Sequence, residues 1–209
     1  MRISCCVVAV LAVLCCMQET ARADLLEVDL DASGDALLTW DTATNLLWLD
    51  LTATTGESTS NILGSDWLTE DGFRYATVAE VATLFEHAAG GLTVDFANNT
   101  ANNLVAVDEL VDMLGYTGYA VGYVPRYEWG YGITGDLSAP GSTSTNRVWA
   151  AYRQYPGVGL LRPSYGNATE FHWGNDIGHF LVRAIPEPTT LALVGLGTLG
   201  IVALRRRKA

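Results

Sequence analysis

The chain has 209 residues, with 12 Lys or Arg against 23 Asp or Glu, and its formal net charge is −11. An acidic chain of this kind repels nucleic acid, so we expect no nucleic-acid partner. All four cysteines lie before residue 17, which excludes a disulfide scaffold, a thiolate metal site and a cysteine nucleophile from the remainder.

The N-terminal segment has the three parts of a secretory signal peptide. Arg2 supplies positive charge, residues 3–17 form an apolar run, and residues 21–23 read A-R-A, an A-x-A cleavage pattern. We therefore predict a signal peptide over residues 1–23 and a mature chain that begins at Asp24. An uncleaved N-terminal anchor and lipidation of a cysteine are the alternatives.

Residues 24–185 have the length of one extracytoplasmic domain. Its first elements are two predicted strands, A-L-L-T-W at residues 36–40 and L-L-W-L-D-L at residues 46–51. Asp41 and Asn45 supply turn chemistry between them, so a hairpin is expected. The six tryptophans are spread along the domain, which favours core and strand positions over a ligand platform.

Two amphipathic helices follow the hairpin. The first starts at a capping box, T-V-A-E at residues 77–80, in which the Thr and Glu side chains satisfy backbone N–H groups. It ends at Gly90-Gly91, and His87 near that end suits the helix dipole. The second is predicted over residues 103–114 and ends at Gly115. The expected buried faces are Val78, Val81, Ala82, Phe85 and Ala88, and then Leu104, Val107, Leu110, Val111 and Leu114.

From Tyr116 onward the chain is rich in Tyr, Gly, Val and Trp, which predicts several short strands. They are expected over residues 118–124, 146–155, 158–164 and 179–185. A polar loop or short helical turn is expected over residues 58–71, and a polar loop over residues 135–146. The predicted fold class is a single α+β domain with two helices packed on short antiparallel strands.

Two sequence elements carry a resemblance to a known family. Residues 41–48 read D-T-A-T-N-L-L-W, and residues 72–81 read G-F-R-Y-A-T-V-A-E-V. They resemble the D-x-x-T-G-L-x-W and G-W-R-x-P-T-x-x-E-L elements of bacterial surface modules of C-type-lectin-like fold. Asn45 replaces a glycine and still tolerates positive φ, while Phe and Ala replace Trp and Pro. F-L-V-R at residues 180–183 is similar to the family's final strand. The resemblance implies a fold and a surface role, and no catalytic residue.

An acidic stretch at residues 29–35 reads D-L-D-A-S-G-D and spaces oxygen ligands like the opening of a calcium loop. Its candidate metal ligands are Asp29, Asp31 and Asp35. Trp40 stands where an EF-hand would place its closing Glu, so a true EF-hand is excluded. The alternative is a solvated acidic turn at the start of the first strand.

A second polar cluster places two imidazoles and two carboxylates within ten residues, and such side chains bind transition metals. Its members are Glu170, His172, Asp176 and His179. An unligated polar loop is the alternative. Ser164 lies in R-P-S-Y-G rather than G-x-S-x-G, and the chain has neither H-E-x-x-H nor a P-loop. We therefore expect no enzyme activity and no cofactor, with a metal-dependent hydrolase using this cluster as a further alternative.

The C-terminal end of the chain combines three features in order. Residues 186–188 (P-E-P) form a stiff spacer, because proline fixes φ and lacks an N–H. Residues 191–204 are uncharged and apolar, and residues 205–208 (R-R-R-K) are basic. Basic residues after an apolar span favour the cytoplasmic side of a membrane.

This order resembles the PEP-CTERM sorting signal of exported bacterial proteins, which the membrane protease exosortase recognises. The resemblance implies a sorting region over residues 186–209 and a transmembrane segment over residues 189–204. Its sorting residues would be Pro186, Glu187, Pro188, Arg205, Arg206 and Arg207. As a helix the apolar run reaches about 21 Å, less than the roughly 30 Å hydrocarbon core, as a temporary anchor would. An ordinary tail anchor, a buried core helix and a basic nucleic-acid patch are the alternatives.

Together these features predict an exported, non-catalytic, C-terminally sorted protein. Its precursor would be anchored in the inner membrane, and the mature form would lie at the cell surface or in the extracellular matrix. The expected partners are exosortase, the membrane through the C-terminal helix, and polysaccharide of the envelope or matrix. A carbohydrate- or calcium-binding surface module is the alternative function.

Overall fold

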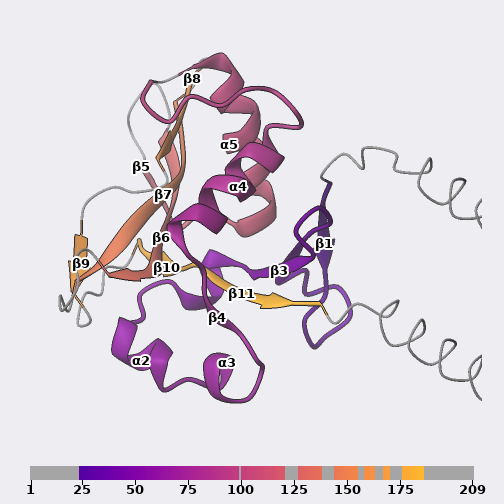
Figure 1. Ribbon diagram of the computed structural model, residues 1–209, viewed down its shortest axis with the longest axis vertical. Coiled ribbons are helices and arrows are strands. Elements are labelled where there is room, and N and C mark those ends of the chain that lie inside the picture. Colours follow the sequence, from indigo (N-terminus) through magenta and orange to yellow (C-terminus); the bar gives the residue numbers. More distant parts are fainter. Residues whose placement is uncertain are drawn as a thin grey trace, which may run out of the picture.

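The computed structural model describes residues 24–98, 100–120, 127–137, 144–154, 158–162, 167–169 and 176–185. The predicted signal peptide, Glu170, His172 and the sorting region of residues 186–209 lie outside the described residues. The described part is an α+β domain in which two β-sheets meet two longer helices (Figure 1).

The first sheet contains both ends of the described chain, and all its strand pairs are antiparallel. Its strands run in the order β1-β2-β3-β11-β4. They are β1 (Leu25–Val28), β2 (Leu38–Asp41), β3 (Leu46–Leu49), β4 (Arg74–Tyr75) and β11 (Leu181–Ala184). The β2–β3 pair confirms the predicted hairpin. Strand β1 was not predicted, because L-L-E-V shows no alternation and its pairing depends on β2.

The second sheet is built on two long strands. Its order is β10-β6-β7-β8, with β5 paired to β6 and β9 paired to β7. The strands are β5 (Gly118–Ala120), β6 (Tyr127–Leu137), β7 (Ser144–Gln154), β8 (Val158–Arg162), β9 (Asn167–Thr169) and β10 (Gly178–His179). Strands β6 and β7 have 11 residues each, and β10 pairs with β6 in parallel. The long strands β6 and β7 and the parallel β10–β6 pair differ from the predicted fold, which had only short antiparallel strands.

The predicted polar loop over residues 135–146 is wrong at both ends. Strand β6 continues to Leu137 and β7 begins at Ser144. Leu137 still pairs with Thr145 after a register shift in the ladder. Backbone pairing across the hairpin therefore extends the strands into residues whose polar side chains had suggested a loop.

Helices α4 (Val78–Ala88) and α5 (Ala101–Leu114) confirm the two predicted helices. The capping box at Thr77 is present. Helix α5 begins two residues earlier than predicted, because the side chain of Thr100 accepts a hydrogen bond from the Asn103 N–H. The predicted loop or helical turn over residues 58–71 contains two short helices, α2 (Thr59–Leu63) and α3 (Asp66–Thr69). A further short helix, η1 (Leu51–Thr54), precedes this region and was not predicted.

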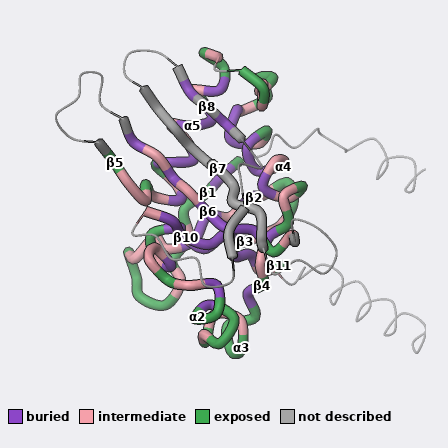
Figure 2. The backbone as a smooth tube through the Cα atoms, turned by 90° about the vertical axis from the view of Figure 1, so that its left-hand side faces the viewer, coloured by how far each residue is buried: buried purple, intermediate pink, exposed green. Residues whose placement is uncertain are grey.

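The main hydrophobic core lies where α4 and α5 meet the two sheets. Phe85 and Leu110 of the helices are buried with Trp48 of β3 and Val182 of β11. Figure 2 shows buried residues along these meeting faces and exposed residues on α2 and α3. Leu84 is also buried, although it was missing from the predicted face of the first helix.

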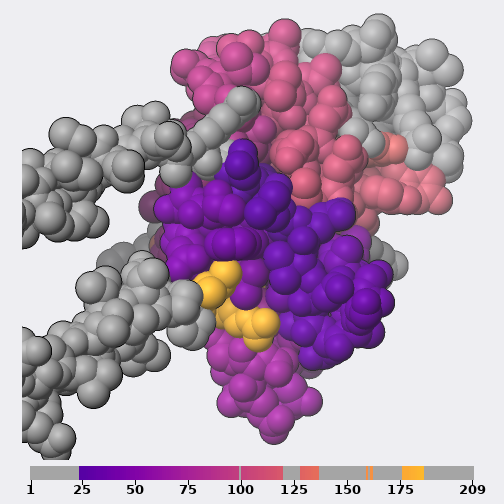
Figure 3. Space-filling view, turned by 90° about the vertical axis from the view of Figure 1, so that its right-hand side faces the viewer, coloured from indigo at the N-terminus to yellow at the C-terminus, as the bar shows by residue number. Residues whose placement is uncertain are grey.

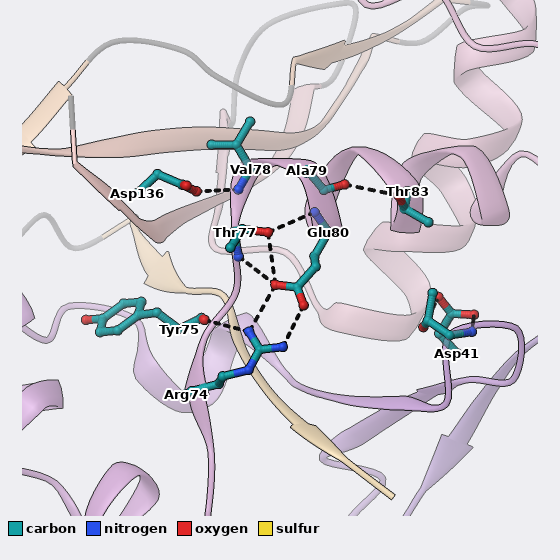
Figure 4. A network of polar contacts seen from close by, with 10 residues as sticks. Asp41, Arg74, Tyr75, Thr77, Val78, Ala79, Glu80, Thr83 and Asp136 are labelled. Carbon is teal, nitrogen blue, oxygen red and sulfur yellow. Dashed lines mark hydrogen bonds and ion pairs between the residues drawn. The ribbon is translucent and has the colours of Figure 1, made fainter. Parts of the chain in front are cut away.

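The second motif of the lectin-like resemblance forms a polar network at the start of α4 (Figure 4). The guanidinium of Arg74 donates to both carboxylate oxygens of Glu80, at 2.6 and 3.0 Å. These hydrogen bonds from Arg74 are the main reason that the pKa of Glu80 falls to about 2. The Asp136 carboxylate accepts from the Val78 N–H. The network fixes the entry of α4 onto the second sheet.

Candidate functional site

The turn formed by Asp41, the last residue of β2, and the four residues 42–45 that lead into β3 holds both ends of the domain. The hydroxyl of Thr42 lies 3.0 Å from the backbone N and 3.0 Å from the backbone O of Asp24, the predicted first residue of the mature chain. The side-chain amide of Asn45 donates to the backbone O of Ile185 at 3.2 Å. Ile185 is the last residue before the predicted sorting spacer, so the predicted signal-peptide cleavage site and the start of the predicted sorting region both adjoin this turn.

The turn is made rigid by the buried carboxylate of Asp41. It accepts hydrogen bonds from the backbone N–H groups of Ala43 and Thr44 and from the Thr44 hydroxyl at 2.7 Å. The Nδ1 atom of His87, in the last turn of α4, lies 2.8 Å from the second Asp41 oxygen. Asn45 adopts a φ of 58°, which confirms the expectation that it tolerates positive φ. The sequence pattern had indicated for His87 only a favourable position at the end of a helix.

The C-terminal exit of the domain lies beside a shallow hollow. The hollow has a volume of about 360 Å³ and is lined by Leu47, Asp71, Gly72, Arg183, Ala184 and Ile185. The guanidinium of Arg183 lies 4.8 Å from the centre of the Phe73 ring, a cation–π contact. Figure 3 shows the yellow C-terminal strand on the same face as the indigo N-terminal segment. This face therefore carries both ends of the described domain, Asp24 and Ile185.

The candidate calcium stretch is a hydrogen-bonded turn in this structure. The Asp35 carboxylate accepts from four backbone N–H groups, at 2.8 to 3.3 Å. These bonds lower the pKa of Asp35 to about 2. Asp29 accepts from the Ala36 N–H. In the part of the chain that the structure describes, no group of three His, Cys, Asp or Glu side chains is placed to hold a metal ion. The calcium role of Asp29, Asp31 and Asp35 stays a prediction.

A neighbouring carboxylate, Asp50, has an unusual environment. Burial, followed by the charges of Glu27 and Asp35, raises the pKa of Asp50 to about 7. Its Oδ1 atom is buried without a hydrogen-bond partner among the described residues, and its side chain caps no helix. The folded state therefore favours the protonated form of Asp50.

We expect Asp50→Asn to raise the free energy of unfolding above neutral pH. Below the unfolded pKa of 3.8 the Asp50 carboxyl is protonated in both the folded and the unfolded state, so its raised pKa costs no stability. As the pH rises toward 7, the carboxyl ionises in the unfolded state but stays protonated in the folded state, so the domain loses stability. The gain at pH 8 should be about 1–2 kcal/mol, below the full value of the shift because solvent screens the partly exposed side chain. Urea melts at pH 4 and pH 8 measure it, with the exposed Glu70→Gln as control. An equal gain at both pH values would contradict the proposed titration.

The structure describes two of the four residues of the second predicted metal cluster, Asp176 and His179. His179 is fully buried. Its Nε2 donates to the Glu57 backbone O at 3.0 Å, and its Nδ1 accepts from the Tyr75 hydroxyl at 2.9 Å. Both ring nitrogens are thus used inside the protein, which argues against His179 as a metal ligand. Asp176 is partly buried, and its backbone O accepts from the Thr117 hydroxyl.

An exposed aromatic pair lies on another part of the surface. Tyr116 and Tyr119 have exposed fractions of 46% and 51%, and their ring centres are 6.0 Å apart. Both side chains are exposed among the residues whose burial the structure describes. Figure 1 places β5, which carries Tyr119, on the side of the domain away from β1. The sequence pattern had indicated only a strand in this region.

Comparisons with known proteins identify the C-terminal end of the chain. Residues 184–208 match the PEP-CTERM protein-sorting motif. No curated protein matches the chain, and no solved structure does. The motif supports an exported protein that is sorted at its C-terminus, starts as a membrane-anchored precursor and is processed by exosortase. None of the helices within the described ranges is long and apolar enough to cross a membrane, and the predicted span over residues 189–204 lies outside those ranges.

Proposed function

We propose that the domain is a non-catalytic surface module that associates with polysaccharide of the envelope or extracellular matrix. The sorting motif supports display outside the cell. The observation that carries the proposal is the exposed pair Tyr116 and Tyr119. Tyrosine combines an apolar ring with a polar hydroxyl at its tip, a combination suited to a partly wet binding surface. A sugar ring has matching apolar C–H faces and polar edges.

The position of the pair supports the same function. The ends of the described domain, Asp24 and Ile185, are bonded to Thr42 and Asn45. Attachment through residues 186–209 would therefore direct that face toward the membrane. Tyr119 lies on β5, away from β1 (Figure 1). The two tyrosines would therefore remain accessible to polymer while the precursor is anchored. The proposed anchor is the apolar span of residues 189–204, with residues 205–208 on the cytoplasmic side.

We also propose the C-type-lectin-like fold for this domain. The first motif contributes the Asp41-centred turn, in which Asn45 takes the positive φ that a glycine would take. The second contributes the Arg74–Glu80 pair at the start of α4. Both motifs thus have structural roles, as the resemblance implies.

We expect the double substitution Tyr116→Ala, Tyr119→Ala to weaken polysaccharide binding about ten-fold, because each aromatic contact contributes about 0.5–1.5 kcal/mol beyond its buried area. Affinity electrophoresis of the mature domain in gels containing polysaccharide from the producing cells measures this change. Leu63→Ala is the matched control, since Leu63 is also exposed and lies on α2. Equal mobility of both variants and the wild type in these gels would rule out the tyrosine pair as the binding surface.

A further inference from the structure

Strand β11 is a central strand of the first sheet, paired with β3 on one side and β4 on the other. Leu181 and Val182 are fully buried, and Ala184 pairs with Leu46 at the end of the ladder. A protease commonly binds its substrate as an extended segment through backbone hydrogen bonds, in the manner of an added strand. Residues 182–184 already pair with β3, and residues 181–182 pair with β4, so each residue of β11 is held in a ladder within the sheet.

Asn45 extends the ordered ladder by one residue. The Ile185 N–H donates to the Asn45 backbone O at 3.1 Å, and the Asn45 side-chain amide donates to the Ile185 backbone O at 3.2 Å. Both backbone polar groups of Ile185 are therefore bonded to the same residue. Pro186 follows and has no N–H to continue the pairing. The described pairing thus reaches the residue directly before the sorting spacer.

We infer that this Asn45–Ile185 latch sets the N-terminal limit of exosortase cleavage, so that the broken peptide bond lies C-terminal to Pro186. The inference rests on the processing that the sorting motif implies. Asn45 acts as a positioning residue, which keeps the chain up to Ile185 out of the protease. In the cleavage, water adds its hydroxyl to the carbonyl carbon of the broken bond, and the nitrogen leaves as a free amine with the remaining proton.

The latch also keeps the processed domain intact. Phe180, the residue directly before β11, packs against Trp48 with the two ring centres 6.2 Å apart. A cut within β11 would remove a central strand and expose this core. A cut beyond Pro186 leaves every hydrogen bond of the first sheet in place. The product would therefore stay folded without its C-terminal segment.

The test compares the full chain carrying Asn45→Asp with the wild type in a host that has the cognate exosortase. Aspartate tolerates positive φ, but it replaces the amide donor with a carboxylate that faces the Ile185 carbonyl. Mass spectrometry of the C-terminus should show wild-type products that all retain Pro186, and variant products that also end earlier. Wild-type products ending at or before Ile185 would overturn the inference.

A second measurement separates the latch from the sorting function. In membranes of a host without exosortase, a broad-specificity protease should cut the variant at residues 181–185 about five-fold faster than the wild type, because one hydrogen bond is lost. Thr77→Ala is the control, since it removes a helix cap and leaves the latch intact. Equal rates for Asn45→Asp and wild type would overturn the latch. Protection at Ile185 without any exosortase-dependent trimming would support the latch and contradict the processing.

Discussion

Phe85→Ala is expected to lower the free energy of unfolding of the domain by about 3–5 kcal/mol. Phe85 is fully buried in the main core between α4, α5 and the sheets. Its ring also lies 6.3 Å from that of Phe96, in the loop that leads to α5. Truncation would leave a cavity that these fixed elements cannot fill.

Denaturant melts of the mature domain measure this loss, and two variants on the same helix provide the scale. Glu86→Ala changes the exposed neighbour and should stay within about 0.5 kcal/mol of the wild type. Thr77→Ala removes the cap of α4 and should cost about 1 kcal/mol. If Phe85→Ala were no more destabilising than Thr77→Ala, α4 would not pack as the structure shows.

Replacement of Pro186, Glu187 and Pro188 by alanine is expected to abolish C-terminal processing and leave a full-length, membrane-retained precursor. Because proline restricts φ, a spacer with two prolines should lose little conformational entropy when a protease binds it. Glu187 adds a single negative charge that a basic enzyme surface can recognise. Alanine restores backbone freedom and removes that charge.

Cell fractionation followed by immunoblotting with antiserum to the domain reports the outcome, in a host with the cognate exosortase. The control exchanges residues 191–204 for another apolar span of equal length and should be processed normally. Antiserum replaces an epitope tag in the predicted loop over residues 135–146, because β6 and β7 occupy both ends of that range and an insertion would disturb them. Normal trimming and release of the triple-alanine variant would mean that the segment is a plain tail anchor.

The sequence by itself determined the features that depend on residues close together in the chain. The capping box needs only Thr77 and Glu80, three residues apart, and it is present. The β2–β3 hairpin and the positive φ of Asn45 follow from the four-residue connection over residues 42–45. The sorting motif is likewise contiguous, and residues 184–208 match it. Such features are set by local backbone geometry and side-chain capping, which a sequence pattern records directly.

Only the tertiary structure decided which distant residues meet. The Asp41–His87 contact joins residues 46 positions apart, and the Asn45–Ile185 contact joins residues 140 positions apart. His179, a metal-ligand candidate in the sequence, is enclosed by Tyr75 and Glu57 instead. These pairings arise because the packed sheets and helices bring remote segments together, and burial then selects the partners that satisfy each polar group. No spacing in the chain encodes that one turn would hold both the first and the last residue of the domain.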